Sequence, residues 1–439
     1  MITANLYYRF AEKEVVELLK HLKESQFWPY EKIRAYQFKK LKVLLGQAYS
    51  DVPYYRNMFQ ELKASPKDIR SFDDFKLLPV LTKDIIRKNS DNLINNKLID
   101  HLLPNSTGGS TGEPLHFYQD GNYHLWAEAA RIRGWYHMPG CEFGAGCAVL
   151  WGEMKEVRED YTPYERIRDF LQWGQISMNA FNLSRERKIH FIKWCRALRP
   201  PLVRGYVTAL KDLALFLEEE HIKFPKIKGV LLCAETVDEP TQSYIEKIFK
   251  APSFNMYGGR ELSLIGMECA EKNGLHEVSE NNYVEFENIT ISNYEKAGNL
   301  IITNLNNFGM PFIRYRIGDI GVPGGNRNCG CGRNLPLIKK VIGRSTEVFI
   351  FYEGTRIAGE MFIHLMKEFP VKEYQFVQVN DSNVILRLKK SENYNDDTKN
   401  QITSLFKRYL PENVTLTIVL VDGFEKTTTG KFRFVYREF

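Results

Sequence analysis

Apolar runs alternate with amphipathic stretches through the middle of the chain. The pattern predicts three amphipathic helices and three apolar strands, in the chain order 184–198, 202–206, 209–220, 229–233, 239–249 and 253–257. Strands that are apolar throughout and alternate with helices are typical of a mostly parallel sheet covered by helices on both faces. Because ligands of open α/β sheets bind beyond the carboxyl ends of the strands, we expect a site where the third strand ends, at Tyr257.

The two flanks of this α/β segment have different patterns. Residues 10–95 predict a mainly helical region, which prolines interrupt. Beyond Gly343 the pattern predicts a small α+β unit, with strands at 348–352, 374–379 and 384–388 and helices at 359–369 and 396–409. We therefore predict two domains, a large α/β N-terminal domain over residues 1–343 and an α+β C-terminal domain over residues 344–439.

Composition and charge narrow the class of protein. With 439 residues, 44% hydrophobic and 26% charged, the chain is typical of a globular protein with two or three domains. The formal net charge of +6 is small for this length and spread along the chain, which does not indicate nucleic-acid binding. No secretory-signal pattern opens the chain, and no apolar run approaches the ~20 residues of a membrane span. We therefore expect a cytoplasmic protein without a membrane span.

The loop from Ser106 to Pro114 reads Ser-Thr-Gly-Gly-Ser-Thr-Gly-Glu-Pro and holds four hydroxyls and three glycines. Glycines allow the backbone to approach a ligand closely, and backbone N–H groups of such loops wrap polyphosphates. The loop lacks the lysine of the P-loop motif, and taken alone it is equally typical of a flexible linker. Motifs further along the chain therefore decide between a phosphate loop and a linker.

Four such motifs lie downstream of this loop in a fixed order. They are Tyr257-Gly258-Gly259-Arg260-Glu261, Arg314-Tyr315-Arg316-Ile317-Gly318-Asp319, Gly343-Arg344 and Thr429-Gly430-Lys431. With Val52–Arg56, Leu78–Lys83 and Tyr374–Gln378, the chain resembles adenylate-forming enzymes of the phenylacetate–coenzyme A ligase group, and among them the CapK-like proteins, over nearly its whole length. The resemblance implies a large adenylation domain followed by a small, mobile C-terminal domain that carries a catalytic lysine.

The resemblance also implies a two-step reaction. A carboxylate attacks the α-phosphate of ATP-Mg to give an acyl-adenylate and pyrophosphate, and an acceptor then takes the acyl group. The β- and γ-phosphates are expected to lie against the loop residues Ser106, Thr107, Gly108, Gly109, Ser110, Thr111 and Gly112. Glu261 is expected to bind Mg²⁺, which prefers carboxylate oxygens, and Asp319 to accept from both ribose hydroxyls.

The resemblance implies further nucleotide contacts from Arg344, Lys431 and the residues around the adenine. Arg344 is expected to donate to the ribose or a phosphate, and Lys431 to bridge the carboxylate and the α-phosphate while charge develops between them. The adenine edge is implied for Ala234, Glu235 and Asn255, with Met256, Tyr257 and Gly258 beside it; a plain core aromatic is the alternative for Tyr257.

The chain departs from the family at two places. Glu113 stands where relatives often have lysine, and we expect it to point away from the phosphates because a carboxylate there repels them. Ser345-Thr346-Glu347 stands where the family often has the paired acids of the domain hinge, which leaves the hinge residue open.

Cysteine and histidine positions predict a zinc site. Four of the seven cysteines lie in apolar or helical contexts and are expected to be buried thiols. Cys269, His276, Cys329 and Cys331 make a complete tetrahedral set, which leaves no open position and so predicts a structural ion. The alternative is three free thiols and a surface histidine.

The acyl pocket is the least defined part of the site. We expect the acid to run along the strand with Arg204 and Tyr206 and the helix 123–136, with Trp126, Trp135 and Trp151 as further walls. Aromatic walls favour a small aromatic acid. Arg131, Arg133 and Arg204 indicate, as an alternative, an acid with a second polar end.

The function that the resemblance implies is that of an ATP-dependent, AMP-forming carboxylate ligase, with coenzyme A as the expected acceptor. One alternative passes the acyl group to an amine or sugar in polysaccharide or secondary-metabolite biosynthesis. An alternative of another class is a catalytically degenerate nucleotide-binding scaffold, which has no need to keep Glu261, Asp319, Arg344 and Lys431 together. The acid, the acceptor, the pathway and the oligomeric state stay open.

Overall fold

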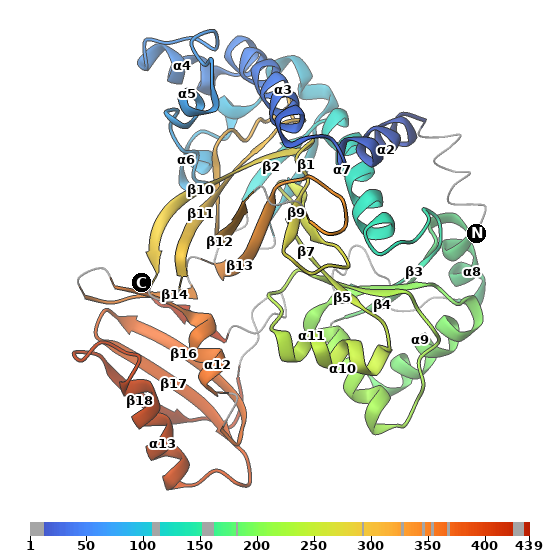
Figure 1. The fold of residues 1–439 in the computed structure, drawn as a ribbon, viewed down its shortest axis with the longest axis vertical. Coiled ribbons are helices and arrows are strands. Elements are labelled where there is room, and N and C mark those ends of the chain that lie inside the picture. Colours follow the sequence, from blue (N-terminus) through green and yellow to red (C-terminus); the bar gives the residue numbers. More distant parts are fainter. Residues whose placement is uncertain are drawn as a thin grey trace.

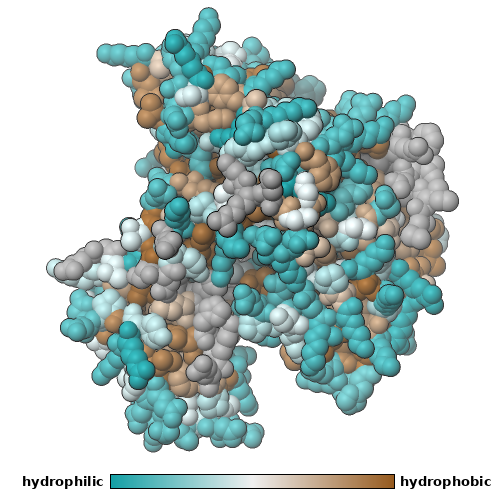
Figure 2. Space-filling model, in the orientation of Figure 1, coloured by the Kyte–Doolittle hydropathy of each residue, from teal (hydrophilic) through white to brown (hydrophobic). Residues whose placement is uncertain are grey.

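Two connected regions make up the molecule, a large mixed sheet flanked by helices and a smaller C-terminal sheet (Figure 1). The computed structural model describes residues 13–107, 115–151, 162–180, 183–291, 294–325, 329–344, 347–352, 355–366, 369–424 and 434–439. In the view of Figure 2 hydrophilic side chains cover most of the surface. None of the helices in the described part of the chain is long and apolar enough to cross a membrane.

The large sheet has a parallel half. Within the described residues it holds eleven strands, in the order β10-β11-β12-β13-β9-β8-β7-β6-β5-β3-β4. The parallel strands are β3 (Cys147–Trp151), β4 (Gln175–Asn179), β5 (Leu202–Tyr206), β6 (Gly229–Cys233) and β7 (Ser253–Gly259). The strands predicted at 202–206 and 229–233 are confirmed at both ends, and the third extends two residues further.

The other half of the large sheet is antiparallel. Its strands are β8 (Ser263–Glu268), β9 (Leu275–Glu277), β10 (Asn282–Ile291), β11 (Tyr294–Asn304), β12 (Tyr315–Gly325) and β13 (Leu337–Arg344). The predicted α/β class is confirmed. The antiparallel half was outside the prediction, because no helices separate these strands and the strand–helix alternation ends at β7.

Helices cover both faces of the parallel half (Figure 1). On one face lie α9 (Arg185–Leu198), α10 (Val207–Glu219) and α11 (Glu239–Phe249), which share a buried cluster with alternate residues of the strands. On the other lie α2 (Lys13–Ser25), α7 (Gly121–Ile132) and the π-helical turn η3 (Arg133–His137). The helix α8 (Pro163–Trp173) precedes β4. The three helices predicted between the strands are confirmed, and the Ser184 hydroxyl caps the first by accepting from the Arg187 N–H.

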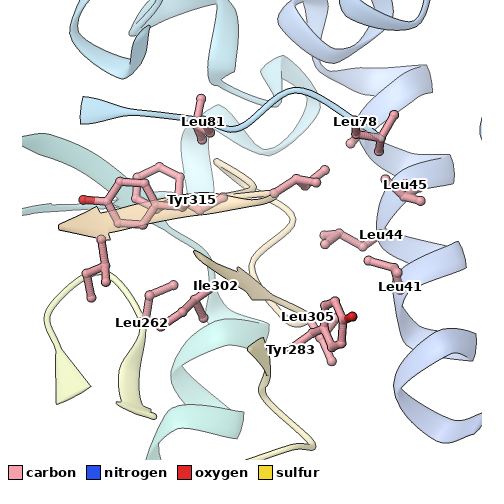
Figure 3. Packing of buried hydrophobic residues seen from close by; sticks show 14 of the residues in the cluster. Leu41, Leu44, Leu45, Leu78, Leu81, Leu262, Tyr283, Ile302, Leu305 and Tyr315 are labelled. Atoms are coloured by element: carbon pink, nitrogen blue, oxygen red, sulfur yellow. The ribbon is translucent and has the colours of Figure 1, made fainter. Parts of the chain in front are cut away.

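A helical layer packs on the antiparallel half. It consists of α3 (Tyr30–Asp51), α4 (Pro53–Glu61), α5 (Phe72–Lys76), α6 (Lys83–Lys88), η1 (Asp91–Leu93) and η2 (Asn96–His101). Figure 3 shows Leu41, Leu44 and Leu45 of α3 pointing toward Leu78 and Leu305, within a cluster that continues to Tyr315 of β12. The segment before α6 pairs with the start of β12, since the Leu81 N–H donates to the Arg314 carbonyl at 2.9 Å and the Leu81 carbonyl accepts from Arg316 at 2.9 Å.

The C-terminal region has a core of its own. Its four-stranded sheet runs in the order β18-β17-β16-β19, with β16 (Val371–Asn380), β17 (Asn383–Lys390), β18 (Thr415–Leu420) and β19 (Val435–Arg437). A short hairpin of β14 (Val348–Ile350) and β15 (Arg356–Ala358) precedes α12 (Gly359–Met366), and α13 (Asp396–Lys407) follows β17. Phe362, Phe376 and Phe406 centre a hydrophobic cluster drawn entirely from residues 349–435. The predicted α+β elements are confirmed, and the boundary between 343 and 344 stays a prediction.

One buried ion pair fastens the helices to the sheet. Arg133 of η3 donates to both carboxylate oxygens of Glu280, at 2.8 and 3.0 Å, and also to the Leu22 carbonyl of α2 at 3.0 Å. Both side chains of the pair are buried, and the Ser25 hydroxyl also donates to Glu280. Although burial acts to raise the pKa of Glu280, the Arg133 charge and its hydrogen bonds hold that pKa below the usual value.

We expect Glu280→Ala to lower the free energy of unfolding by about 3–5 kcal/mol, because it leaves a buried guanidinium without its counter-ion. Denaturant unfolding followed by circular dichroism measures the change. The matched control is Glu220→Ala, which removes the carboxylate of the exposed pair with Arg185 and should leave the curve unchanged. Equal midpoints for Glu280→Ala and the control would rule out a stabilising role for the buried pair.

Candidate active site

A short hairpin holds the ends of the predicted phosphate loop. Strands β1 (Leu103–Ser106) and β2 (His116–Gln119) pair antiparallel, with Ser106 opposite His116. Beyond them the Thr107 N–H donates to the Leu115 carbonyl at 3.0 Å, and the Leu115 N–H donates to the Thr107 hydroxyl at 2.9 Å. The predicted phosphate contacts Gly108, Gly109, Ser110, Thr111 and Gly112, and Glu113 as well, lie outside the described residues.

Hydrogen bonds join this hairpin to the end of β7. The Arg260 guanidinium donates to the Ser106 carbonyl at 3.1 Å. In return the Arg260 carbonyl accepts from the Gln119 amide at 2.8 Å and from the Tyr123 hydroxyl at 3.2 Å. The base of the loop therefore lies beside the segment that carries Glu261.

Two buried carboxylates face this edge, each held by a tyrosine. The Tyr315 hydroxyl donates to Glu261 at 3.2 Å, and the Tyr257 hydroxyl donates to Asp319 at 2.7 Å. Arg344 forms an ion pair with Asp319, with its Nε 3.0 Å from Oδ1. Burial and the neighbouring carboxylates raise the pKa of both phenols, so they stay hydrogen-bond donors. The structure thus brings Tyr257, Asp319 and Arg344 into direct contact.

The backbone around these carboxylates requires glycine at two positions. A Cβ on Gly258 would lie 2.3 Å from the Ser263 carbonyl oxygen, so a side chain there would clash with the chain of β8. Gly318, next to Asp319, has a φ of +93°, which only glycine adopts without strain. The motif glycines therefore serve the turns that orient the tyrosine and the two acids.

Lys83 belongs to the same edge, and no role for it was predicted. It opens α6, two residues after the Leu81 bridge to Tyr315. Burial and the Arg344 charge lower the pKa of Lys83, whereas the carboxylates of Glu261 and Asp319 raise it. The charges of Arg344, Glu261 and Asp319 therefore all act on Lys83, which indicates that its ammonium group lies on the same side of the sheet as the two acids. The only indication of a role for Lys83 in the sequence was that it ends Leu78–Lys83, one of the segments that resemble the ligase family.

The predicted adenine edge is formed by neighbouring strand ends. Ala234 follows β6 with a φ of +65°, and Asn255 of β7 lies opposite Leu232 in the register. The Glu235 carboxylate accepts from the Thr208 N–H at 2.8 Å and from its hydroxyl at 3.0 Å, at the start of α10. Glu235 therefore caps the N-terminus of α10 in this structure.

The C-terminal end of the site is described only in part. Lys431 and the hinge candidates Ser345 and Thr346 lie outside the described residues. Glu347 accepts a hydrogen bond from the Arg344 N–H at 3.0 Å. A carboxylate therefore stands directly behind Arg344 at the junction of the two regions.

The four predicted zinc ligands lie together. Their ligand atoms fall within 4.8 Å of one another, with the Cys269 and Cys329 sulfurs 3.6 Å apart and Cys331 Sγ 3.4 Å from His276 Nε2. Burial lowers the pKa of His276 to about 4, which keeps its imidazole neutral near pH 7. Neutral imidazole is the form that binds metal.

The residues predicted for the acyl pocket separate into different environments. Trp151 and Tyr206 stack with ring centroids 4.8 Å apart, and the Arg204 guanidinium lies 3.7 Å from the Trp135 ring centroid. The prediction is wrong for Trp126, which packs on Lys40 and His21 because its side of α7 faces α2 and α3. It is also wrong for Arg133, whose charge is used by Glu280.

Comparison with known proteins agrees with this geometry. Residues 349–438 match the family model described as the CapK C-terminal domain. Protein CapK of Staphylococcus aureus is 26% identical over 408 residues, covering 87% of this chain and 84% of CapK. Phenylacetate-coenzyme A ligase of Thermus thermophilus is 23% identical over 348 residues, covering 74% of each chain.

Solved structures show the same fold. 2-Hydroxyisobutyryl-CoA ligase, in the postadenylation state with R3-HIB-AMP, has a TM-score of 0.72 at 18% identity and covers 94% of this chain and 93% of its own. O-succinylbenzoate coenzyme A synthetase of Bacillus subtilis, with ATP and magnesium ion, has a TM-score of 0.52 at 15% identity, over 75% and 68% of the two chains. The predicted resemblance is confirmed: the chain has homologues named CapK and phenylacetate-coenzyme A ligase, its fold matches that of adenylate-forming ligases, and residues 349–438 match the model of the CapK C-terminal domain.

Proposed function

We propose that the protein is an ATP-dependent, AMP-forming ligase that activates a carboxylic acid as its acyl-adenylate. The observation that carries this proposal is the meeting of Glu261, Asp319 and Arg344 beside the base of the Ser106 loop, at the carboxyl edge of the sheet. A scaffold that only binds nucleotide has no need to keep Glu261, Asp319 and Arg344 together at one edge. The relatives named ligases support the same reaction.

Each residue has a role that its chemistry supports. Ser106, Thr107 and the loop after them hold the β- and γ-phosphates, which leave as pyrophosphate. Asp319 accepts from the ribose hydroxyls, and Tyr257 keeps its carboxylate oriented. Glu261 is the carboxylate suited to Mg²⁺, an ion that neutralises phosphate charge when bound.

Two lysines, Lys83 and Lys431, neutralise negative charge on the phosphates and on the reacting carboxylate. The loop carries Glu113 where relatives often have lysine, so another cation must face the phosphates. Lys83, on which the charges of Glu261 and Asp319 act, is the cation we assign to this role. Lys431, carried by the C-terminal domain over residues 344–439, bridges the carboxylate and the α-phosphate during the first step. Movement of this domain about the 343–347 junction then exposes the adenylate to the acceptor.

The acceptor we propose is coenzyme A, which the names of the phenylacetate-coenzyme A ligase relatives support, with an amine or a sugar as the alternative. Pyrophosphate release from ATP with a panel of carboxylic acids tests the first step, and the absence of release with every acid would leave only the scaffold. Repeating the assay with coenzyme A or amines identifies the acceptor from the product. ATP and coenzyme A as cosubstrates, and seven cysteines that form no disulfide, fit a cytoplasmic location.

We expect Lys431→Ala to slow adenylate formation by roughly 10²- to 10³-fold, because it removes one preorganised charge from the transition state of the first step. The second step, started from synthetic acyl-adenylate, should keep nearly its full rate. Single-turnover assays of each half-reaction measure both. Equal losses in the two half-reactions would reject the bridging role.

We expect Lys83→Met to raise the KM for ATP by about 10- to 100-fold, the effect of losing one charged contact worth about 1.5–3 kcal/mol. Lys83→Arg should recover part of the loss, since it keeps the charge. Lys88→Met, at the exposed end of the same helix, is the matched control and should behave as wild type. An unchanged KM for Lys83→Met would remove Lys83 from the phosphate site.

We further propose that Cys269, His276, Cys329 and Cys331 bind one structural zinc ion. Three sulfurs and one neutral imidazole are a donor set that zinc prefers, and four protein ligands leave no position for substrate. The ion would join the end of β8 to the segment before β13, and so brace the antiparallel half of the sheet that carries Asp319.

Metal analysis of the purified protein should find about one zinc per chain, the number that one four-ligand site holds. Cys329→Ser should lose the metal and lower the melting temperature, because metal binding is linked to the folded state. Cys195→Ser, a buried thiol outside the cluster, should keep the metal. Retention of full zinc content by Cys329→Ser would show that the cluster is not the binding site.

A further inference from the structure

Arg204 is a cation placed in a largely apolar part of the sheet. It lies on β5, in register with Val149 of β3 and Leu231 of β6, both buried. Its guanidinium stacks on Trp135 at 3.7 Å from the ring centroid and lies 5.6 Å from that of Trp151. The central strands of a parallel sheet rarely carry a charge on a covered face, so the position needs an explanation.

No protein group in the described part of the chain neutralises Arg204. Its Nε is sealed from solvent without a hydrogen-bond partner, and so is the nearby Trp135 Nε1. The other two arginines predicted for the acyl pocket are different, because Arg133 pairs with Glu280 and Arg131 pairs with Glu128. Arg204 is partly buried, and a charge in such a place without a counter-ion contributes little to stability, which makes a ligand that supplies the negative charge a physical reason to keep it.

Neighbouring strands connect Arg204 to the proposed reaction centre. Two residues along β5, Tyr206 is in register with Cys233 of β6. The Cys233 sulfur lies 3.5 Å from that of Met256, and the next residue is Tyr257, the donor to Asp319. Burial raises the pKa of the Cys233 thiol to about 12, and the Arg204 charge opposes that rise, which agrees with their proximity.

We propose that the acid activated by this protein is a dicarboxylic acid, and that Arg204 binds the carboxylate that is not adenylated. The inference rests on the proposed ligase function and names its substrate class. One carboxylate lies near Tyr257 and reacts, while the body of the acid extends past Met256 toward Trp135. The guanidinium then donates two parallel hydrogen bonds to the far carboxylate, a geometry that lysine or glutamine does not reproduce.

The test compares acids that differ only in the second carboxylate. ATP–pyrophosphate exchange is measured with terephthalate against 4-isopropylbenzoate and with glutarate against 5-methylhexanoate, in which two methyl groups replace the two oxygens. The wild type should prefer the diacid of at least one pair by about 10-fold or more, since an unpaired buried donor penalises the neutral analogue. Arg204→Gln should reverse or erase that preference, and Arg196→Gln, at an exposed position on α9, should keep it.

Two further measurements separate the possible failures. Calorimetric titration with terephthalate and with glutarate reports binding without turnover, and the melting temperature of Arg204→Gln should equal or exceed that of the wild type, because the substitution removes an unpaired charge. If the neutral acids exchange as well as the diacids and Arg204→Gln changes nothing, the diacid proposal is overturned while the ligase function stands. If no acid exchanges but a diacid binds the wild type and not Arg204→Gln, recognition stands and the ligase function fails. If neither exchange nor binding occurs, both are overturned.

Discussion

Strand β7 is the constraint on which the site depends. It pairs in parallel with β6 and antiparallel with β8, so one strand joins the two halves of the sheet. Because of this junction, the carboxyl ends of the parallel strands meet the β12–β13 pair that carries Asp319 and Arg344. The hydrogen bond from Tyr257 to Asp319 crosses between the halves. A nucleotide bound at this edge would therefore contact both halves at once.

Most of the arginines discussed above in the large sheet region pair with an acidic side chain of the same chain. Arg133 is neutralised by Glu280, and Arg314 by Glu285 at 3.2 Å. Each arginine also donates to backbone carbonyls of a helical segment, Arg133 to Leu22 and Arg314 to Lys76 and Leu78. Such pairs are structural, because each charge is satisfied within the chain. The Asp319–Arg344 pair differs, since its arginine is partly exposed at the active-site edge. Arg204 differs further, since its Nε has no hydrogen-bond partner among the described protein groups.

The pattern of apolar and polar residues predicted those strands and helices whose ends are set by turn and capping residues nearby in the sequence. The strands at 202–206 and 229–233 and the helix at 239–249 were predictable because apolar runs end at turn residues and capping side chains. The pairing of the three-residue strand β9 with β13 is set by contacts between distant segments, which leave no periodic signal. The same holds for Lys83, whose segment is placed next to β12 by the bridge between Leu81 and Tyr315. The sequence also could not distinguish Arg133 from Arg204, because only the structure shows that Arg133 pairs with Glu280 whereas the Nε of Arg204 has no partner.

The central claim is that a carboxylate oxygen attacks the α-phosphate of ATP. An acid labelled with ¹⁸O in its carboxylate tests this directly, because the attacking oxygen becomes the bridge of the acyl-adenylate and stays on the phosphate when the acyl group leaves. Mass spectrometry of the nucleotide product should therefore find AMP with one ¹⁸O, whichever acceptor takes the acyl group. Unlabelled AMP, or label in orthophosphate together with ADP, would contradict the account.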